Sequence, residues 1–231
     1  MVRDVFDFVF LMDASSSMEK HLNVVRKSTL SFFSQLSVRQ DIYPPVRDWR
    51  AKIVGFRDYA MDGPENWLID HPFTRDISEL ERQFSSIKGN GRDNSPGSLI
   101  DALYQIATMG ETDPQQEPDP LRWRHKREAS HIVILLTDVS TPNRLEPFLT
   151  RLARPSLEAA GLDVSAICDK VFDEIERERI ILHIVAPEAE CYNELACVPR
   201  AEYVVTEGNA LEATISDPRF WGRIMQQFSV S

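Results

Sequence analysis

Three residues with oxygen-bearing side chains stand at alternate positions near the start of the chain: Asp13, Ser15 and Ser17, in the segment D-A-S-S-S. They directly follow the apolar run 5–12, which has the length and residue types of a buried strand. A carboxylate and two hydroxyls are hard oxygen donors, which suit Mg²⁺ or Mn²⁺ and suit softer metals poorly. Helix capping is the alternative role, because Ser and Asp are favoured at the N-terminus of any helix.

Two further segments bring carboxylates to comparable places. Asp138 follows the apolar run 131–136, and Asp93 lies in the glycine-containing loop 89–97, just before a helical pattern. Ligands of an open parallel sheet bind outside the carboxyl ends of its strands, so these side chains are expected at one edge. The predicted metal ligands are therefore Asp13, Ser15, Ser17, Asp93 and Asp138. Three alternatives stay open for Asp93: it binds the cation directly, binds it through a water, or points away from it. For Asp138 taken alone, the alternative is an ordinary turn residue at the end of a strand.

The elements that must position these residues alternate along the chain. Strands buried on both faces are predicted for the continuous apolar runs 5–12, 131–136 and 180–186, and weaker strands for 51–56, 67–73 and 201–205. Apolar stripes at helical spacing occupy 22–36, 77–84, 99–106, 164–175 and 211–228, the last broken near Pro218. The turn cluster 62–66 predicts an antiparallel hairpin. We therefore predict an α/β fold with a doubly wound, mostly parallel central sheet, one antiparallel edge strand and helices on both faces.

Length and composition predict one domain over residues 1–231, with a loop insertion at about 110–130 and a helical segment at about 144–178. The 36 acidic residues exceed the 26 Lys and Arg, for a net charge of −10, which argues against nucleic acid as a partner. The basic cluster 122–127 around Trp123 is accordingly expected to be a solvated loop.

The cysteines and the apolar runs bear on location. Three cysteines, Cys168, Cys191 and Cys197, fit ordinary thiols in a reducing compartment better than a disulfide framework. No apolar run reaches the roughly 18 residues that span a membrane. We therefore expect a cytoplasmic protein with no membrane partner.

The ligand pattern resembles that of the von Willebrand factor type A (vWA) family. Its metal-ion-dependent adhesion site (MIDAS) combines D-x-S-x-S, here Asp13, Ser15 and Ser17, with a Thr or Asp in a second loop and an Asp after a later strand. The last two positions fall on Asp93 and Asp138. The segments G-F-R-D-Y (55–59) and R-W-R (122–124) resemble the bacterial and hemicentin-like branch. The resemblance covers about residues 5–228 and implies a Rossmann-like vWA fold, a bound divalent cation and recognition of a protein through that cation.

One departure from the adhesive members concerns charge. Where they carry a neutral Thr, Asp93 would bring a third carboxylate, so the site should hold its cation more firmly but attract an outside carboxylate less. Mg²⁺ is the first expectation, with Mn²⁺ and Ca²⁺ as alternatives. The resemblance further implies a protein partner, such as an AAA+ ATPase or another component of a multi-protein system.

Two other functions compete with a metal-dependent interaction module. A metal-dependent hydrolase would need a second metal or a general base beside the first, and no such pair is visible. A structural assembly subunit with a silent metal site is the other alternative. The chain contains no P-loop and no G-x-S-x-G nucleophile elbow, so we expect no enzymatic activity. The long irregular segment 110–130 and residues 141–160 are expected to flank the binding edge and to give partner specificity.

Overall fold

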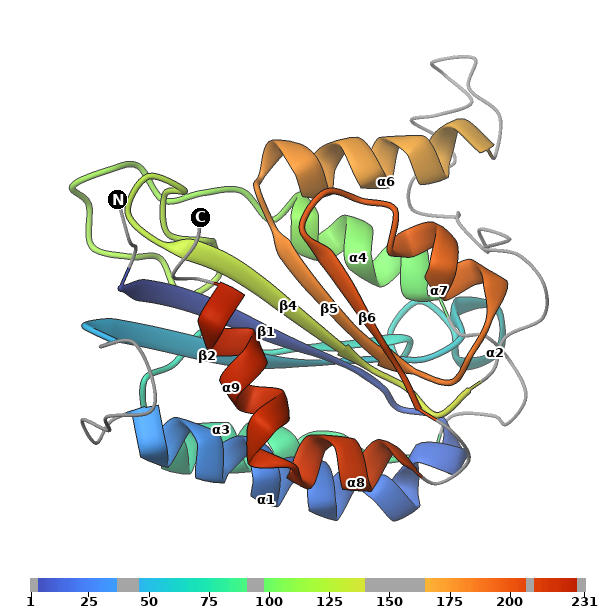
Figure 1. The fold of residues 1–231 in the computed structure, drawn as a ribbon. Helices are drawn as coiled ribbons and strands as arrows, with labels where there is room; N and C mark the ends of the chain where they lie inside the picture. The colour runs from blue at the N-terminus through green and yellow to red at the C-terminus, as the bar shows by residue number, and fades with distance from the viewer. Residues whose placement is uncertain (1–3, 37–45, 91–97, 140–164, 207–209, 228–231) are drawn as a thin grey trace.

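A computed structural model describes residues 4–36, 46–90, 98–139, 165–206 and 210–227. Its centre is a six-stranded sheet with the strand order β3-β2-β1-β4-β5-β6 (Figure 1). The β2–β3 pair is antiparallel and the other four pairs are parallel, which confirms the predicted sheet. The strands are β1 (Val5–Asp13), β2 (Asp48–Phe56), β3 (Leu68–Asp70), β4 (Ser130–Leu136), β5 (Ile181–Ala186) and β6 (Ala201–Val205).

Helices cover both faces of the sheet (Figure 1). The helices are η1 (Ser16–Met18), α1 (Glu19–Leu36), α2 (Tyr59–Asp62), α3 (Ile77–Ser86), α4 (Leu99–Ala107), α6 (Ser165–Arg177), α7 (Glu190–Leu195), α8 (Ala210–Ser216) and α9 (Pro218–Gln227). Helices α1, α3, α8 and α9 pack on one face, and α4, α6 and α7 on the other. Among the described residues, no helix combines the length and apolar character needed to cross a membrane.

Strand β1 is buried along its whole length, because its side chains alternate between two apolar clusters. Phe8 and Phe10 join the cluster under α1 and α9, whereas Val9 and Leu11 join the cluster under α4 and α6. This burial on both faces is why the strand reads as a continuous apolar run in sequence. It fixes the end of β1, where the predicted ligands begin.

Aromatic packing fixes the position of α1 against the sheet. The rings of Phe32 in α1 and Trp221 in α9 stack with their centroids 4.5 Å apart, and Phe33 contacts Phe8 edge to face. Burying a large apolar side chain stabilises the fold by about 1.5–3 kcal/mol, so these contacts anchor the helix firmly. They thereby also place η1, which lies between β1 and α1.

Residues 110–130 correct two expectations. Within them, the basic cluster 122–127 is only partly solvated: Arg122 and Arg127 are exposed, but Trp123 is 0% exposed and Arg124 is buried in an ion pair with Asp7. The segment 110–130 also does not flank the predicted binding edge, because Asp7 lies near the start of β1 and the predicted ligands follow its end. The sequence cluster looked solvated because the buried carboxylate that pairs with Arg124 lies 117 residues away.

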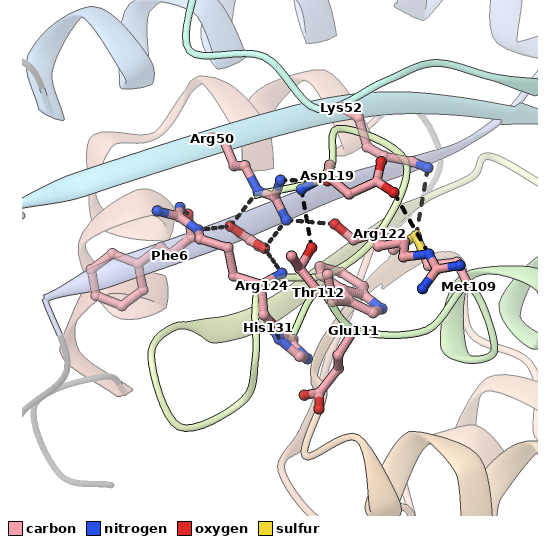
Figure 2. Close-up of polar contacts among 12 residues, drawn as sticks. Phe6, Arg50, Lys52, Met109, Glu111, Thr112, Asp119, Arg122, Arg124 and His131 are labelled. Carbon is pink, nitrogen blue, oxygen red and sulfur yellow. Dashed lines mark hydrogen bonds and ion pairs between the residues drawn. The ribbon is translucent and has the colours of Figure 1, made fainter. Parts of the chain in front are cut away.

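Asp7 is the centre of this network at the amino edge of the sheet. Both of its oxygens accept hydrogen bonds from Arg50 and Arg124. Arg50 also donates to the backbone carbonyls of Asp119 and Arg122 (Figure 2). Burial alone would raise the pKa of Asp7, but the hydrogen bonds and charges of the two arginines outweigh it and lower that pKa. The network attaches the 110–130 segment to β1 and β2.

Candidate metal centre

Strands β1 and β4 carry the predicted ligands to one place. The two strands are parallel neighbours in which Met12 lies opposite Leu136, so the next residues, Asp13 and Thr137, stand side by side. Asp13 Oδ2 accepts a hydrogen bond of 2.8 Å from the Thr137 hydroxyl. The register of the sheet therefore brings the ends of both ligand-bearing strands together, as the sequence predicted.

Four of the five predicted ligands form one continuous hydrogen-bonded group. Ser15 Oγ lies 3.0 Å from Ser17 Oγ, and Ser17 Oγ donates to Asp138 Oδ1 at 2.7 Å. Asp13 joins the group through its Oδ1, which accepts from the Ser15 backbone N–H at 2.8 Å. The fifth, Asp93, lies outside the described residues.

A local turn explains how D-A-S-S-S folds into this shape. An Asp side chain that accepts from the backbone N–H two residues on reverses the chain in an Asx-turn, as Asp13 does with Ser15. Ala14 is fully buried and its N–H donates to the carbonyl of Phe56 in β2, so the turn stays attached to the sheet. Although Ser15 is the N-cap residue of η1, its hydroxyl makes no capping bond, which argues against the capping alternative.

Two carboxylates, Asp13 and Asp138, lie close together in this group, and one of them is deeply buried. Asp13 is 4% exposed, and burial raises the pKa of its carboxyl to about 6. Hydrogen bonds from Ser15 and Thr137 lower this pKa, whereas the nearby charge of Asp138 raises it further. Among the described residues, Lys20 Nζ lies 3.8 Å from Asp138 Oδ2, on a side chain that is 60% exposed. A bound cation would relieve this unfavourable burial of negative charge.

The donor set fits a hard divalent cation. Two carboxylates and two hydroxyls from a buried turn and a strand end offer only oxygen atoms, the ligands that Mg²⁺, Mn²⁺ and Ca²⁺ prefer. Asp13 and Asp138 would supply negative charge, and Ser15 and Ser17 neutral oxygens. Thr137, which the sequence reasoning missed, holds Asp13 from outside the ligand set. Its place before Asp138 in L-L-T-D is the signal that could have identified it.

The segment that leads toward Asp93 is attached beside the serine turn. The Gly89 N–H donates to Glu19 Oε2 at 2.7 Å, and Glu19 follows η1 directly. Arg57 holds the same segment by donating to the Lys88 carbonyl and the Asn90 side chain. The sequence reasoning missed both of these supports, because each joins segments more than 30 residues apart.

A second group with metal-binding residue types lies at the opposite edge. Ligand atoms of Glu111, His131 and Glu178 lie within 4.8 Å of one another. The protein already engages this group: Lys126 lies 3.4 Å from Glu178, and His131 places its ring nitrogens against the backbone carbonyls of Glu178 and Arg124. His131 is therefore held by backbone carbonyls, and the group needs no cation to balance it.

Comparisons with known proteins support the fold. No family model matches the chain, and no curated protein matches it. Solved structures do: the pilus adhesin SpaC from Lactobacillus rhamnosus GG matches with a TM-score of 0.61 and 13% identity, over 99% of this chain and 31% of the adhesin. Proximal thread matrix protein 1 from the mussel byssus matches with a TM-score of 0.51 and 11% identity, over 93% of this chain and 47% of that chain.

A second structure of the mussel protein, at the same TM-score, is described as having a zinc-occupied MIDAS motif. This chain spans about a third of the adhesin and just under half of the mussel protein. At 11–13% identity such likeness shows the fold alone. Together with the strand order and the helices on both faces, it establishes that this chain has a vWA-like α/β fold.

Proposed function

We propose that this chain is a divalent-cation-binding interaction module of the vWA type, which recruits a protein partner through a metal site at the carboxyl edge of its sheet. One observation carries the proposal. Asp13, Ser15, Ser17 and Asp138 form a single hydrogen-bonded group from two neighbouring strand ends, and its buried carboxylate has a raised pKa. The MIDAS motif of the structurally similar mussel protein is consistent with such a site.

Each residue of the group has a distinct part in cation binding. Asp13 and Asp138 would hold the cation by charge, and the hydroxyls of Ser15 and Ser17 would supply neutral oxygens. The Thr137 hydroxyl and the Ser15 N–H keep the Asp13 carboxylate in place. The bound cation supplies an electrophilic point for an oxygen ligand of a partner.

The hard oxygen donors, the sparse cysteines and the resemblance to the bacterial and hemicentin-like branch together support a more specific version of the proposal. The cation is Mg²⁺, the compartment is the cytoplasm, and the partner is an AAA+ ATPase or another component of a multi-protein system. The module acts by binding and not by catalysis. With a third carboxylate from Asp93, the site would favour retention of its cation over capture of an outside carboxylate.

Calorimetric titration with MgCl₂ and MnCl₂ tests the proposal. The wild-type chain should bind one cation, and Asp13→Asn should weaken binding by at least about 100-fold, because it removes a charged ligand. Asp173→Asn, the same change on an exposed position of α6, should leave the affinity unchanged. A flat titration of the wild-type chain, or equal affinities for wild type and Asp13→Asn, would overturn the proposal. Partner capture that survives EDTA would show that the cation has no part in recruitment.

A further inference from the structure

The backbone that follows Asp138 is held at two successive peptide groups. The Val139 N–H donates to the Thr137 hydroxyl oxygen at 3.1 Å, which closes a tight turn around Asp138. The Val139 carbonyl accepts a hydrogen bond of 2.9 Å from the hydroxyl of Tyr192. The first contact is local, whereas the second comes from a residue 53 positions away.

Tyr192 is placed to hold this carbonyl rigidly. It lies in α7 and is 2% exposed, and its ring contacts that of Tyr203 in β6, with centroids 5.9 Å apart. Burial raises the pKa of Tyr192, so the hydroxyl keeps its proton. A buried hydroxyl on a packed ring has little freedom and a strong need for a partner. The Val139 carbonyl is that partner.

The same hydroxyl lies close to the candidate metal centre. Against the main effect of burial, a hydrogen bond with the Thr137 side chain lowers the pKa of Tyr192, and the nearby charge of Asp13 raises it. A phenol has a single proton, however, and Tyr192 donates that proton to the backbone at Val139. Tyr192 therefore acts on the site through the turn that carries Asp138.

We propose that Tyr192 is a positioning residue of the metal centre, which holds the turn 137–139 in the shape that directs Asp138 toward the serine turn. With the turn held, Asp138 Oδ1 stays at the Ser17 hydroxyl, 2.7 Å away. The carboxylate is then ordered before a cation arrives, so cation binding costs less conformational entropy. The inference rests on the proposed function, since it assigns a supporting residue to the same cation site.

Manganese affinity, measured by calorimetry, tests the role of the hydroxyl. Tyr192→Phe removes one oxygen atom, keeps the buried ring and should weaken Mn²⁺ binding about tenfold, the loss typical of a missing support outside the ligand set. Tyr203→Phe is the matched control in the neighbouring ring, because its hydroxyl donates to the Pro187 carbonyl. It should leave the affinity unchanged. Tyr192→4-aminophenylalanine keeps a donor at the same place and should bind Mn²⁺ as wild type does.

A double-mutant cycle separates positioning from a general loosening of the fold. The Asp138→Ala chain has no carboxylate at this position to direct, so adding Tyr192→Phe to it should change the remaining Mn²⁺ affinity less than about twofold. A loosened fold would also disturb Asp13 and would weaken binding about tenfold in this background as well.

Four results would each overturn the inference. They are equal affinities for wild type and Tyr192→Phe, equal weakening by Tyr203→Phe, weakened binding by the 4-aminophenylalanine chain, and an undiminished loss in the Asp138→Ala background. Absence of Mn²⁺ binding by the wild-type chain would instead overturn the proposed function itself.

Discussion

Three buried aspartates show how much the surroundings of a carboxylate decide its role. Asp7 is paired with two arginines and has a lowered pKa, whereas the pKa of Asp13 is raised to about 6 at the candidate metal centre. Asp101, in the first turn of α4, is 5% exposed, and its Oδ2 has no hydrogen-bond partner among the described residues. Burial raises the pKa of its carboxyl to about 7, against the opposing effect of its own backbone N–H. Asp101 is therefore a carboxylic acid that changes charge near neutral pH.

The titration of Asp101 should appear in the stability of the fold. Because its pKa is higher in the folded chain than the ordinary 3.8, protonation favours the folded state. This stabilisation is complete below the unfolded pKa and is lost as pH rises through about 7. Between pH 5 and pH 8 the free energy of unfolding should fall by about 2–3 kcal/mol on this account.

Urea unfolding in EDTA at several pH values measures the effect. The difference between wild type and Asp101→Asn isolates the contribution of this one group, since other titrating residues are common to both chains. The variant should gain stability relative to wild type as pH rises. Asp173→Asn, on the exposed side of α6, should retain the wild-type slope. Parallel pH profiles for wild type and Asp101→Asn would show that the carboxyl has an ordinary pKa.

At the scale of elements, the sequence predicted the strands and long helices because each buries a continuous or periodic apolar surface. Residues 201–205 match β6 as predicted, and the break near Pro218 separates α8 from α9. The short helices α2 and α7 were missed, since four and six residues are too few to show a period.

In the candidate metal centre, too, some features could be predicted from local sequence and others could not. Asp13, Ser15, Ser17 and Asp138 could be predicted because strand ends place them, without knowledge of side-chain contacts. The supports that Glu19 and Arg57 give to the segment leading to Asp93 could not, because they depend on contacts between residues 70 and 31 positions apart. Strand order thus brings these side chains together, whereas packing between distant segments determines what supports them.

Gly89 is the point where the segment leading to Asp93 meets α1. A Cβ added at this glycine would lie 2.7 Å from the backbone N and Cα of Glu19, closer than two atoms can pack. Gly89→Ala should therefore displace the segment, break the bond from the Gly89 N–H to Glu19, and lower the free energy of unfolding by about 1–3 kcal/mol. Lys88→Ala changes an exposed neighbour and should cost less than about 0.5 kcal/mol. Urea unfolding of both variants checks this, and a Gly89→Ala chain as stable as wild type would contradict the close approach.

Across the whole molecule, β1 joins two sites with different tasks. Asp7 near its start belongs to the buried ion-pair network with Arg50 and Arg124, and Asp13 at its end belongs to the candidate metal centre. The first network holds the 110–130 segment on the sheet and the second gathers oxygen donors. Stability and cation binding should therefore respond to different substitutions.

Arg124→Ala tests this separation. Removing the side chain leaves buried Asp7 with Arg50 as its remaining ion-pair partner and removes bonds to the Phe6 carbonyl and to Asp48. Breaking such a buried pair should lower the free energy of unfolding by about 3 kcal/mol or more. Arg127→Ala, an exposed change in the same segment, should have little effect on stability. Manganese affinity should match wild type in both variants, and a weakened affinity in folded Arg124→Ala would show that the two ends of β1 are not independent.

The strand order has one more consequence. β1 and β4 are the third and fourth of six strands, so the oxygen cluster lies at the middle of the sheet's carboxyl edge. A body seated there would approach end-on, along the strand axes, and its footprint would be centred between the two helical layers. Such an approach would leave the outward side of α1 uncovered.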